Sequence, residues 1–405
     1  MVLVAAALVT TACASGSAQT AGSTRQAESS PTSTTVYDYP DASARFLNRM
    51  MNEPRPVENS AMPPRHLDEE QFPESLVDRT RIVWGGVAPD AIASIDEPTF
   101  EQADTVDWIE DQEAVLVLQL DGEIRVYPVQ VMIWHEIVND RVDGRPVTVT
   151  YCPLCNSAVA FDRRIGDRVL DFGTSGSLYR SALVMYDRQT ESLWSHFTGT
   201  AVVGELTGTE LETFPSATVP WALWRDAYPD GLVLSQDTGF NRSYGRNPYP
   251  GYDDVDSRPF LFEGEVDGRY TAMTRLVGVE IDGDALAVPL QTLRDERAVA
   301  ATVGDVDIVV LWEQGTASAL DTADIASGDD VGATGVFIPV VDGQTLTFAP
   351  ADTGFVDDQT GSGWNLLGKA TTGPLAGAQL EPVAHVDTFW FAWGAFRPDS
   401  AVVGS

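Results

Sequence analysis

The sequence predicts a strand-rich α+β protein in which two related repeat units in tandem form one pseudo-symmetric globular body. Apolar residues alternate along 115–120 and 147–151, a pattern typical of strands. Glycine-containing turns at 165–167 and 341–343 indicate hairpins. Helix-like apolar spacing is found in a short run at 129–138. We therefore expect many strands with short helices between them.

The two repeat units are predicted from an internal duplication, because residues 187–230 resemble residues 357–399. A fainter match pairs residues 147–162 with residues 307–321. Two tryptophan pairs and several residues around them recur at matching positions, namely Gln189, Thr190, Ser192, Trp194, Trp221, Trp224 and Pro229, which match Gln359, Thr360, Ser362, Trp364, Trp390, Trp393 and Pro398. Chance does not place so many matched residues in order, so we expect two copies of one unit.

The duplication divides the chain into three parts. The first repeat unit covers residues 36–240, and the second covers residues 278–405. Residues 241–277 form the linker between them, and its first part is rich in Tyr, Pro and Gly. We expect this linker to join the two units.

The N-terminus is typical of an exported lipoprotein. Residues 1–13 form a lipoprotein-type signal peptide, since the short apolar run 2–9 is followed by Ala12 and the lipobox residue Cys13. Residues 14–35 are small and polar, so we expect a flexible tether. The alternative is an ordinary cleaved signal with an incidental Cys13. The sequence thus predicts an exported cell-envelope lipoprotein, on the outer face of the cytoplasmic membrane or in the periplasm.

The charge balance restricts the partners of this protein. The chain has 25 Lys and Arg against 60 Asp and Glu, which gives a formal net charge of −35. Nucleic-acid binding depends on basic contacts to phosphate, so we expect no nucleic-acid partner. We expect attachment to the membrane through a lipid anchor instead. A small-molecule or protein partner stays open.

Three reactive side chains occur only in the first unit. Cys152 and Cys155 form a Cys-Pro-Leu-Cys motif that directly follows a predicted strand, and His135 lies upstream. The second unit has Glu296 at the position of His135 and no cysteine in the matching region, 311–315. This contrast indicates that the first unit carries the chemistry and the second is structural.

A soft-metal site is the first interpretation of this trio. Two thiolates two residues apart can bind one ion, and an imidazole is a compatible third ligand for zinc or copper. His196 is the candidate fourth ligand of a closed site. An open fourth position would suit metal handling or a metal-dependent reaction. The sequence therefore predicts a zinc or copper site formed by His135, Cys152 and Cys155.

Two other interpretations of the motif stay open, and with them the question of whether the protein is an enzyme. Cys152 and Cys155 would serve as a thiol–disulfide redox pair if one thiol had a lowered pKa, with His135 as a proton shuttle. The order of elements does not match a thioredoxin unit. Alternatively, the cysteines form a plain structural disulfide in a non-enzymatic binding or scaffold protein.

A second polar cluster follows the hairpin of the first unit. Ser175, Tyr179 and Arg180 lie close together in sequence with Gly176. Backbone N–H groups and a guanidinium can bind an anionic ligand, so these residues are a candidate ligand site. The same residues also suit an ordinary turn whose polar groups are satisfied internally.

Several of these motifs together resemble the domain-of-unknown-function 3179 family. The similarity is carried by residues 134–140 and 151–155 and extends from about residue 80 to the C-terminus. Further matching motifs lie at residues 172–176, 185–188, 192–194 and 389–393. The resemblance implies a bacterial or archaeal, often exported protein in which the His-Glu and Cys-Pro-x-Cys positions belong together. It implies no reaction. Family members commonly have Gln where this chain has His196, which weakens His196 as a general ligand.

Overall fold

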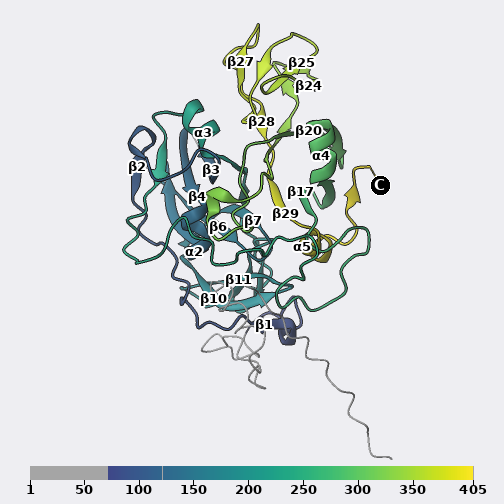
Figure 1. Ribbon diagram of the computed structural model, residues 1–405. Helices are drawn as coiled ribbons and strands as arrows, with labels where there is room; N and C mark the ends of the chain where they lie inside the picture. Colours follow the sequence, from purple (N-terminus) through teal and green to yellow (C-terminus); the bar gives the residue numbers. More distant parts are fainter. Residues whose placement is uncertain (1–71, 121, 405) are drawn as a thin grey trace, which may run out of the picture. The chain divides into compact units, whose positions relative to one another are not determined.

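The computed structural model describes residues 72–120 and 122–404 (Figure 1). The predicted signal peptide at 1–13, its Cys13 and the predicted tether at 14–35 lie outside the described residues. Within the described part, the helices are too short or too polar to cross a membrane.

Three sheets and a two-stranded hairpin form the first half of the described chain. Five-stranded sheets have the orders β1-β10-β11-β12-β13 and β15-β3-β4-β16-β2, and a four-stranded sheet has the order β14-β7-β6-β5. The hairpin is β8-β9. The strands are β1 (Ile82–Trp84), β2 (Phe100–Gln102), β3 (Ala114–Leu120), β4 (Glu123–Pro128), β5 (Ile137–Val142), β6 (Arg145–Cys152), β7 (Ser157–Asp162), β8 (Arg164–Ile165), β9 (Arg168–Val169), β10 (Phe172–Tyr179), β11 (Ala182–Asp187), β12 (Leu193–Ser195), β13 (Ala201–Val203), β14 (Thr213–Phe214), β15 (Ser216–Pro220) and β16 (Leu232–Leu234).

Three four-stranded sheets and another hairpin form the second half. Their orders are β29-β17-β18-β30, β19-β20-β21-β28 and β24-β25-β26-β27, with the hairpin β22-β23. The strands are β17 (Arg275–Ile281), β18 (Asp284–Pro289), β19 (Ala298–Val303), β20 (Val306–Glu313), β21 (Ala333–Ile338), β22 (Val340–Val341), β23 (Gln344–Thr345), β24 (Phe348–Pro350), β25 (Phe355–Asp357), β26 (Gly363–Trp364), β27 (Ala370–Thr372), β28 (Glu381–Pro382), β29 (His385–Phe389) and β30 (Ala401–Val402). The predicted strand-rich character, with few helices, is confirmed.

The α-helices are short. Each has seven residues: α2 (Val129–His135), α3 (Trp221–Ala227), α4 (Leu290–Glu296) and α5 (Trp390–Phe396). Three 3₁₀ turns are η1 (Arg79–Arg81), η2 (Ala103–Thr105) and η3 (Ile325–Ser327). Helix α2 ends three residues before the predicted limit of 138, because Glu136 has φ 59° in the left-handed region and the chain then enters β5.

Corresponding elements follow one another in the same order in both halves. The orders β15-β3-β4-β16 and β29-β17-β18-β30 match, and in each the last pair of strands is parallel. The predicted match of 147–162 with 307–321 holds only through β20, since residues 314–332 contain no strand and β21 takes the place of β7. Strand β17 begins at Arg275, inside the predicted linker.

Residues of both halves share one apolar cluster. It includes Phe161 and Trp194 from the first half and Phe389 and Trp390 from the second, all nearly inaccessible to solvent. Strand β29 lies against β7 and β15 (Figure 1). The turn between β6 and β7, which contains the cysteine motif, therefore lies near the contact between the halves.

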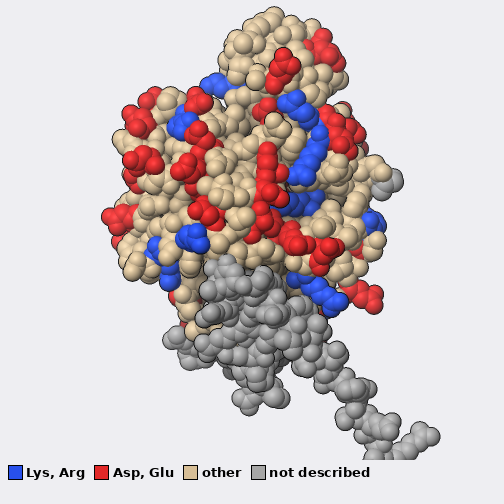
Figure 2. All heavy atoms as spheres, in the orientation of Figure 1, with Lys and Arg blue, Asp and Glu red and all other residues tan. Residues whose placement is uncertain are grey.

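The acidic excess of the chain is spread over its surface. Figure 2 shows Asp and Glu side chains scattered over this face, with Lys and Arg in smaller groups among them.

Candidate functional site

The cysteine motif occupies the turn between β6 and β7. Cys152 is the last residue of β6, and it pairs with Ser157, the first residue of β7. Both Cys152 and Cys155 are free thiols, with 1% and 0% of their surfaces exposed. Two thiols at this spacing are thus held inside the protein, away from bulk solvent.

The two thiols have opposite acidities. Burial opposes ionisation of Cys152, but its sulfur accepts hydrogen bonds from the Cys155 thiol and from backbone N–H groups of Cys155, Leu183 and Leu154. These donors hold the pKa of Cys152 below its ordinary value. Burial and the adjacent Cys152 sulfur raise the pKa of Cys155 well above its ordinary value. Cys152 is therefore the thiol that ionises first.

A chain of hydrogen bonds connects Cys155 to His196. The Cys155 sulfur lies 2.9 Å from the Ser157 hydroxyl, which lies 2.9 Å from Nε2 of His196. Nδ1 of His196 lies 2.8 Å from the Thr150 hydroxyl, which itself donates to the Val159 carbonyl. Thr150 must therefore accept from His196, which assigns the Nδ1–H tautomer and leaves Nε2 to accept from Ser157.

This histidine is held in its neutral form. His196 is fully buried, and burial lowers its pKa to about 3. A neutral imidazole accepts the Ser157 proton without becoming charged, and this holds the Ser157 hydroxyl 2.9 Å from the Cys155 sulfur, whose own proton is donated to Cys152. His196 consequently positions the Cys155 thiol through Ser157, and it is a poor base for removing the proton.

His135 is engaged elsewhere. Its Nδ1 lies 2.7 Å from the Ala93 carbonyl, and its Nε2 lies 2.7 Å from the Tyr244 hydroxyl. No hydrogen bond among the described residues joins this ring to either sulfur. Within residues 72–120 and 122–404, no three His, Cys, Asp or Glu side chains are grouped so that they could hold one metal ion. The geometry thus does not bring the predicted metal trio together.

Glu136, the residue after His135, lies beside the thiol pair instead. Glu136 is buried, with 7% of its surface exposed. Burial raises its pKa well above the ordinary value, and negative charge on neighbouring Cys152 raises it further. The site therefore contains a neutral carboxyl group next to its most acidic thiol.

A small cavity of about 50 Å³ lies against this carboxyl. Besides Glu136, its walls include the polar side chains of Ser177 and Tyr249. Both of these residues are buried, and the Ser177 hydroxyl has no hydrogen-bond partner among the described residues. Buried polar groups are rarely left unpaired, so each such group needs an explanation. The remaining walls are mostly apolar and are formed by Gly85, Val87, Ile92, Leu154, Thr174, Gly176, Leu178, Leu183 and Phe260.

The second half lacks all of these groups. Strand register places Glu313 opposite Ala333, as Cys152 lies opposite Ser157. Arg297 takes the place of Glu136 directly after helix α4, and it also has a positive φ, of 60°. Its guanidinium forms an ion pair with the Glu313 carboxylate at 3.4 Å. A carboxyl–thiol pair in the first half thus corresponds to an ordinary ion pair in the second.

The position of His196 is also apolar in the second half. Trp194 pairs with Met185, and Trp364 pairs with Phe355 in the same way, so the residue two places further is Leu366. Leu366 is buried, like His196. The scaffold therefore folds with an apolar side chain at this place, and the hydrogen-bonded chain is a feature of the first half.

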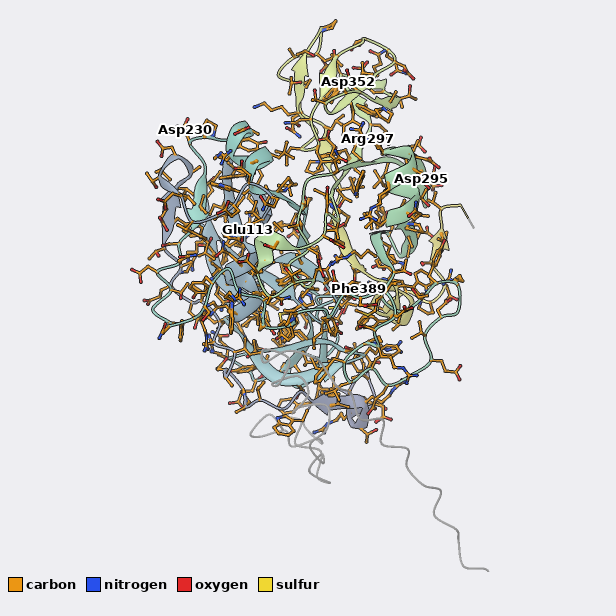
Figure 3. The ribbon with its side chains drawn as sticks, viewed as in Figure 1. Glu113, Asp230, Asp295, Arg297, Asp352 and Phe389 are labelled. Carbon is orange, nitrogen blue, oxygen red and sulfur yellow. The ribbon has the colours of Figure 1, made fainter. Side chains whose placement is uncertain are left out.

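The second half nevertheless holds the cysteine turn in place. The carbonyl of Cys155 accepts hydrogen bonds from the Thr388 hydroxyl at 2.8 Å and from the backbone N–H of Phe389 at 3.3 Å. Phe389 is labelled in Figure 3. The Tyr252 hydroxyl donates to the Leu154 carbonyl at 2.9 Å. Residues far away in sequence thus fix the backbone between the two cysteines.

The predicted anion-binding cluster has internal partners. The Ser175 hydroxyl donates to the Val184 carbonyl, and Arg180 donates to the Tyr179 hydroxyl and to the Ala395 carbonyl. These contacts match the alternative of a satisfied turn. An anionic ligand at Ser175, Tyr179 and Arg180 stays a prediction.

Sequence reasoning missed several residues of this site. Glu136 was named only as part of the His-Glu position that the family resemblance places with the cysteine motif, and no role was predicted for it. Ser157 was not singled out, although it closely follows Cys155. Ser177 and Tyr249 carried no signal, because only the folded chain brings them to the cavity. Both His196 and the cysteines were named, but their link through Ser157 was not foreseen.

Comparison with known proteins gives a family and no activity. Residues 89–400 match the family model described as a protein of unknown function (DUF3179). No curated protein and no solved structure matches the chain. Because the match covers well over half of its residues, the chain belongs to the DUF3179 family of proteins of unknown function.

Proposed function

We propose that the protein is a thiol–disulfide redox protein in which Cys152 is the nucleophile and Cys155 the resolving thiol. The observation that carries this proposal is the pair of adjacent free thiols with opposite pKa shifts. A thiolate attacks disulfides, and a thiol does not, so the first step belongs to Cys152. Cys155 keeps its proton until the second step.

The exchange balances without any further reactant. The Cys152 thiolate attacks one sulfur of a substrate disulfide, and the other substrate sulfur departs as a thiolate. Cys155 then attacks the Cys152 sulfur and releases the second substrate sulfur. The two protons of the dithiol pass to the two departing sulfurs, so the substrate is reduced and Cys152–Cys155 is oxidised. The positioned thiol of Cys155 shortens the life of the mixed disulfide.

Glu136 supports the assignment of the first step. Burial and the Cys152 charge both raise the pKa of its carboxyl. A buried neutral acid beside a thiolate can exchange a proton with it as the charge on sulfur changes. Glu136 is thus the candidate proton partner of Cys152.

Zinc or copper handling stays the alternative function. Cys152 and Cys155 have the residue types for it, but His135 is bonded to Ala93 and Tyr244. A metal at the two sulfurs would need other ligands. Elemental analysis of the purified full-length protein and its Cys152→Ser variant tests this alternative, since a bound soft metal would be lost in the variant. A structural disulfide without redox activity is the third possibility.

We also propose that the protein is exported, that it carries a lipid anchor and that its two halves arose by duplication. We infer attachment of the protein to the cell envelope through Cys13, from the sequence alone. We also infer that the halves are repeat copies. Support comes from the matching strand orders and from the matching Trp194 and Trp364 positions. Mass spectrometry of the mature N-terminus tests the lipid anchor.

Trapping of a mixed disulfide tests the redox function. Full-length Cys155→Ser protein is treated with 2-hydroxyethyl disulfide, a small uncharged probe, and its peptides are analysed by mass spectrometry. We expect one mercaptoethanol group on Cys152, because no resolving thiol is left to release it. The native protein should instead form the Cys152–Cys155 disulfide.

Cys152→Ser is the matched control. It keeps the buried Cys155, whose pKa is raised, and should therefore react far more slowly. Equal labelling of both variants, or no labelling of Cys152, would refute the assigned roles. Peptide analysis separates these sites from Cys13.

A further inference from the structure

The closed structure keeps both thiols out of reach of a substrate. Cys152 and Cys155 are 1% and 0% exposed. Thiol–disulfide exchange brings the attacking sulfur into direct contact with a substrate sulfur. The redox function proposed above therefore requires that part of the cover over the cysteine turn moves.

A long irregular segment supplies part of this cover. All residues between β16 and β17, 235–274, are described, and they contain no strand or helix. Loops of this length without secondary structure are uncommon in compact domains and are often active-site lids or binding loops. Residues 249–260 of this segment, which we call the lid, contact the cysteine turn.

Aromatic side chains make this contact. Tyr249, Tyr252 and Phe260 belong to the same buried apolar cluster as the two cysteines. Burial raises the pKa of the Tyr249 and Tyr252 hydroxyls, and negative charge on the nearby Cys152 sulfur contributes to both shifts. Residues 253–259 between these aromatic residues are exposed or half-buried. The lid is thus a surface loop whose two ends are held by aromatic residues beside the thiols.

The Tyr252 hydroxyl joins both ends of the lid to the cysteine turn. It donates to the Leu154 carbonyl at 2.9 Å and accepts from the Phe260 N–H at 3.2 Å. Leu154 lies between the two cysteines in the sequence. The Ser181 hydroxyl donates to the Phe260 carbonyl at the same end of the lid. Loss of the Tyr252 hydroxyl should therefore weaken the closed position of the lid.

The packing between the lid and the cysteine turn is incomplete. Tyr249 and Phe260 of the lid line the cavity of about 50 Å³, as do Leu154 of the turn and Glu136. Side chains that line a cavity lack contact partners on one side, so they gain less dispersion energy than in a close-packed core. The buried Ser177 hydroxyl in the same walls has no hydrogen-bond partner among the described residues. The cover over the thiols is consequently weakest at the lid.

We propose that the lid, residues 249–260, opens and closes over Cys152 and Cys155, and that the Tyr252 hydroxyl holds it closed. This inference rests on the redox function proposed above. A disulfide substrate reaches Cys152 when the aromatic ends of the lid move away, and the closed lid protects the thiols between such encounters. The sheets stay folded during this movement, as in other local openings of native proteins. The rate of a reaction at Cys152 then follows the population of the open form.

Alkylation of the thiols measures lid opening without any redox step. Reduced full-length native protein and its Tyr252→Phe variant are treated with iodoacetamide, and mass spectrometry of the peptides gives the rate at Cys152. Phenylalanine keeps the ring but loses the bond to Leu154, so we expect alkylation about tenfold faster in the variant. Below the unfolding transition, both rates should change little with urea, because a local opening exposes little surface.

Tyr127→Phe is the matched control. Tyr127 is a fully buried tyrosine on β4, outside the lid, and its hydroxyl donates to Asp140 at 2.7 Å. Its loss should destabilise the whole fold but leave alkylation without urea unchanged. Three results would each overturn the lid: equal rates for Tyr252→Phe and native protein, the same acceleration by Tyr127→Phe, or a rate that rises steeply with low urea concentrations.

Reaction with 2-hydroxyethyl disulfide separates the lid from the redox function. We expect Tyr252→Phe protein to form the Cys152–Cys155 disulfide about tenfold faster than native protein, for the same reason as in alkylation. Disulfide formation at equal rates in the two proteins would overturn the lid and leave the redox function standing. Faster alkylation of the variant without a disulfide in either protein would refute the redox function and leave the lid as a cover of the thiols.

Discussion

Burial decides the charge of two titratable residues, and it does so with opposite effects on acid stability. Glu113 is 4% exposed, and burial raises its pKa to about 7. His196 is fully buried, and its pKa falls to about 3. Each shift disfavours the charged form of its side chain. The free energy of unfolding should therefore depend on pH through both groups, in different windows.

Glu113→Gln tests the first window. The carboxyl of Glu113 accepts from the Glu110 N–H and from Gln130, and its position is marked in Figure 3. Its pKa is higher in the folded protein than in the unfolded chain, so the stability it contributes is complete below about pH 4.5 and is lost as pH rises towards 7. Glutamine mimics the protonated acid. Urea unfolding of the variant and the native protein gives the difference in their free energies of unfolding at each pH. We expect this difference to favour the variant by up to about 3 kcal/mol more at pH 8 than at pH 4. An equal effect at both pH values would contradict this account.

A double variant, Ser157→Ala with His196→Leu, tests the second window. The unfolded chain protonates His196 below pH 6.5, whereas the folded protein does not, so stability falls as pH drops from 6.5 towards 3. In this window, His196 lowers the free energy of unfolding by about 1.4 kcal/mol for each pH unit of acidification. The variant copies Ala333 and Leu366 of the second half and should fold, but its stability should fall less steeply with acid. Urea unfolding from pH 7 to 4 gives both slopes, and identical slopes would refute the burial argument.

At the scale of elements, one hydrogen-bonded motif supports the β11–β12 and β25–β26 hairpins. Asp187 accepts from the indole N–H of Trp194 at 2.9 Å, and Asp357 accepts from that of Trp364 at 2.9 Å. Each carboxylate also accepts from a threonine three residues further on. These contacts explain why the Gln-Thr, Ser and Trp positions recur in the two halves.

Asp357→Ala should show the strength of this motif. The change leaves the buried Trp364 N–H and the Thr360 N–H without their acceptor, so we expect a loss of about 3 kcal/mol. Asp352→Ala is the control, because Asp352 is exposed and lies between β24 and β25 (Figure 3). Chemical unfolding measures both. A loss below about 1 kcal/mol for Asp357→Ala would mean that water replaces the carboxylate.

Local patterns made some elements predictable from the sequence. The hairpins at 165–167 and 341–343 were correct, since each turn is specified by adjacent residues. The two cysteines were also predicted correctly to lie together, because they are close neighbours in the sequence. The link of Cys155 to His196 was not predictable, because it depends on which residues share a face of β6. Thr150 and Cys152 face the same side, and His196, the residue after β12, meets that side.

At the scale of the whole described molecule, the two halves share a core around the cysteine turn. Phe389 and Thr388 bond to the Cys155 carbonyl, and Phe389 belongs to the same apolar cluster as Cys152 and Cys155. The sequence predicted two units, joined by a linker, in one globular body, but not which residues of the second half contact the cysteine turn. Contacts of this kind join residues more than two hundred positions apart, and no local pattern encodes them.

The shared core predicts that the halves unfold together. Asp357→Ala, in the second half, should shift the exposure of Cys152 and Cys155 to lower urea concentration, by the same amount as it shifts the loss of secondary structure. Pulsed alkylation with mass spectrometry gives the thiol exposure, and far-UV circular dichroism gives the secondary structure. Thiols that stay protected to the native midpoint would show that the halves unfold independently.

The most direct test of the central claim is a redox titration of the full-length native protein. Samples are equilibrated at graded ratios of reduced to oxidised dithiothreitol, quenched with acid and alkylated, and mass spectrometry then gives the state of Cys152 and Cys155. The account predicts one reversible two-electron transition in which both thiols disappear together and form a disulfide with each other. Thiols that never become oxidised, or a disulfide that never becomes reduced, would contradict it.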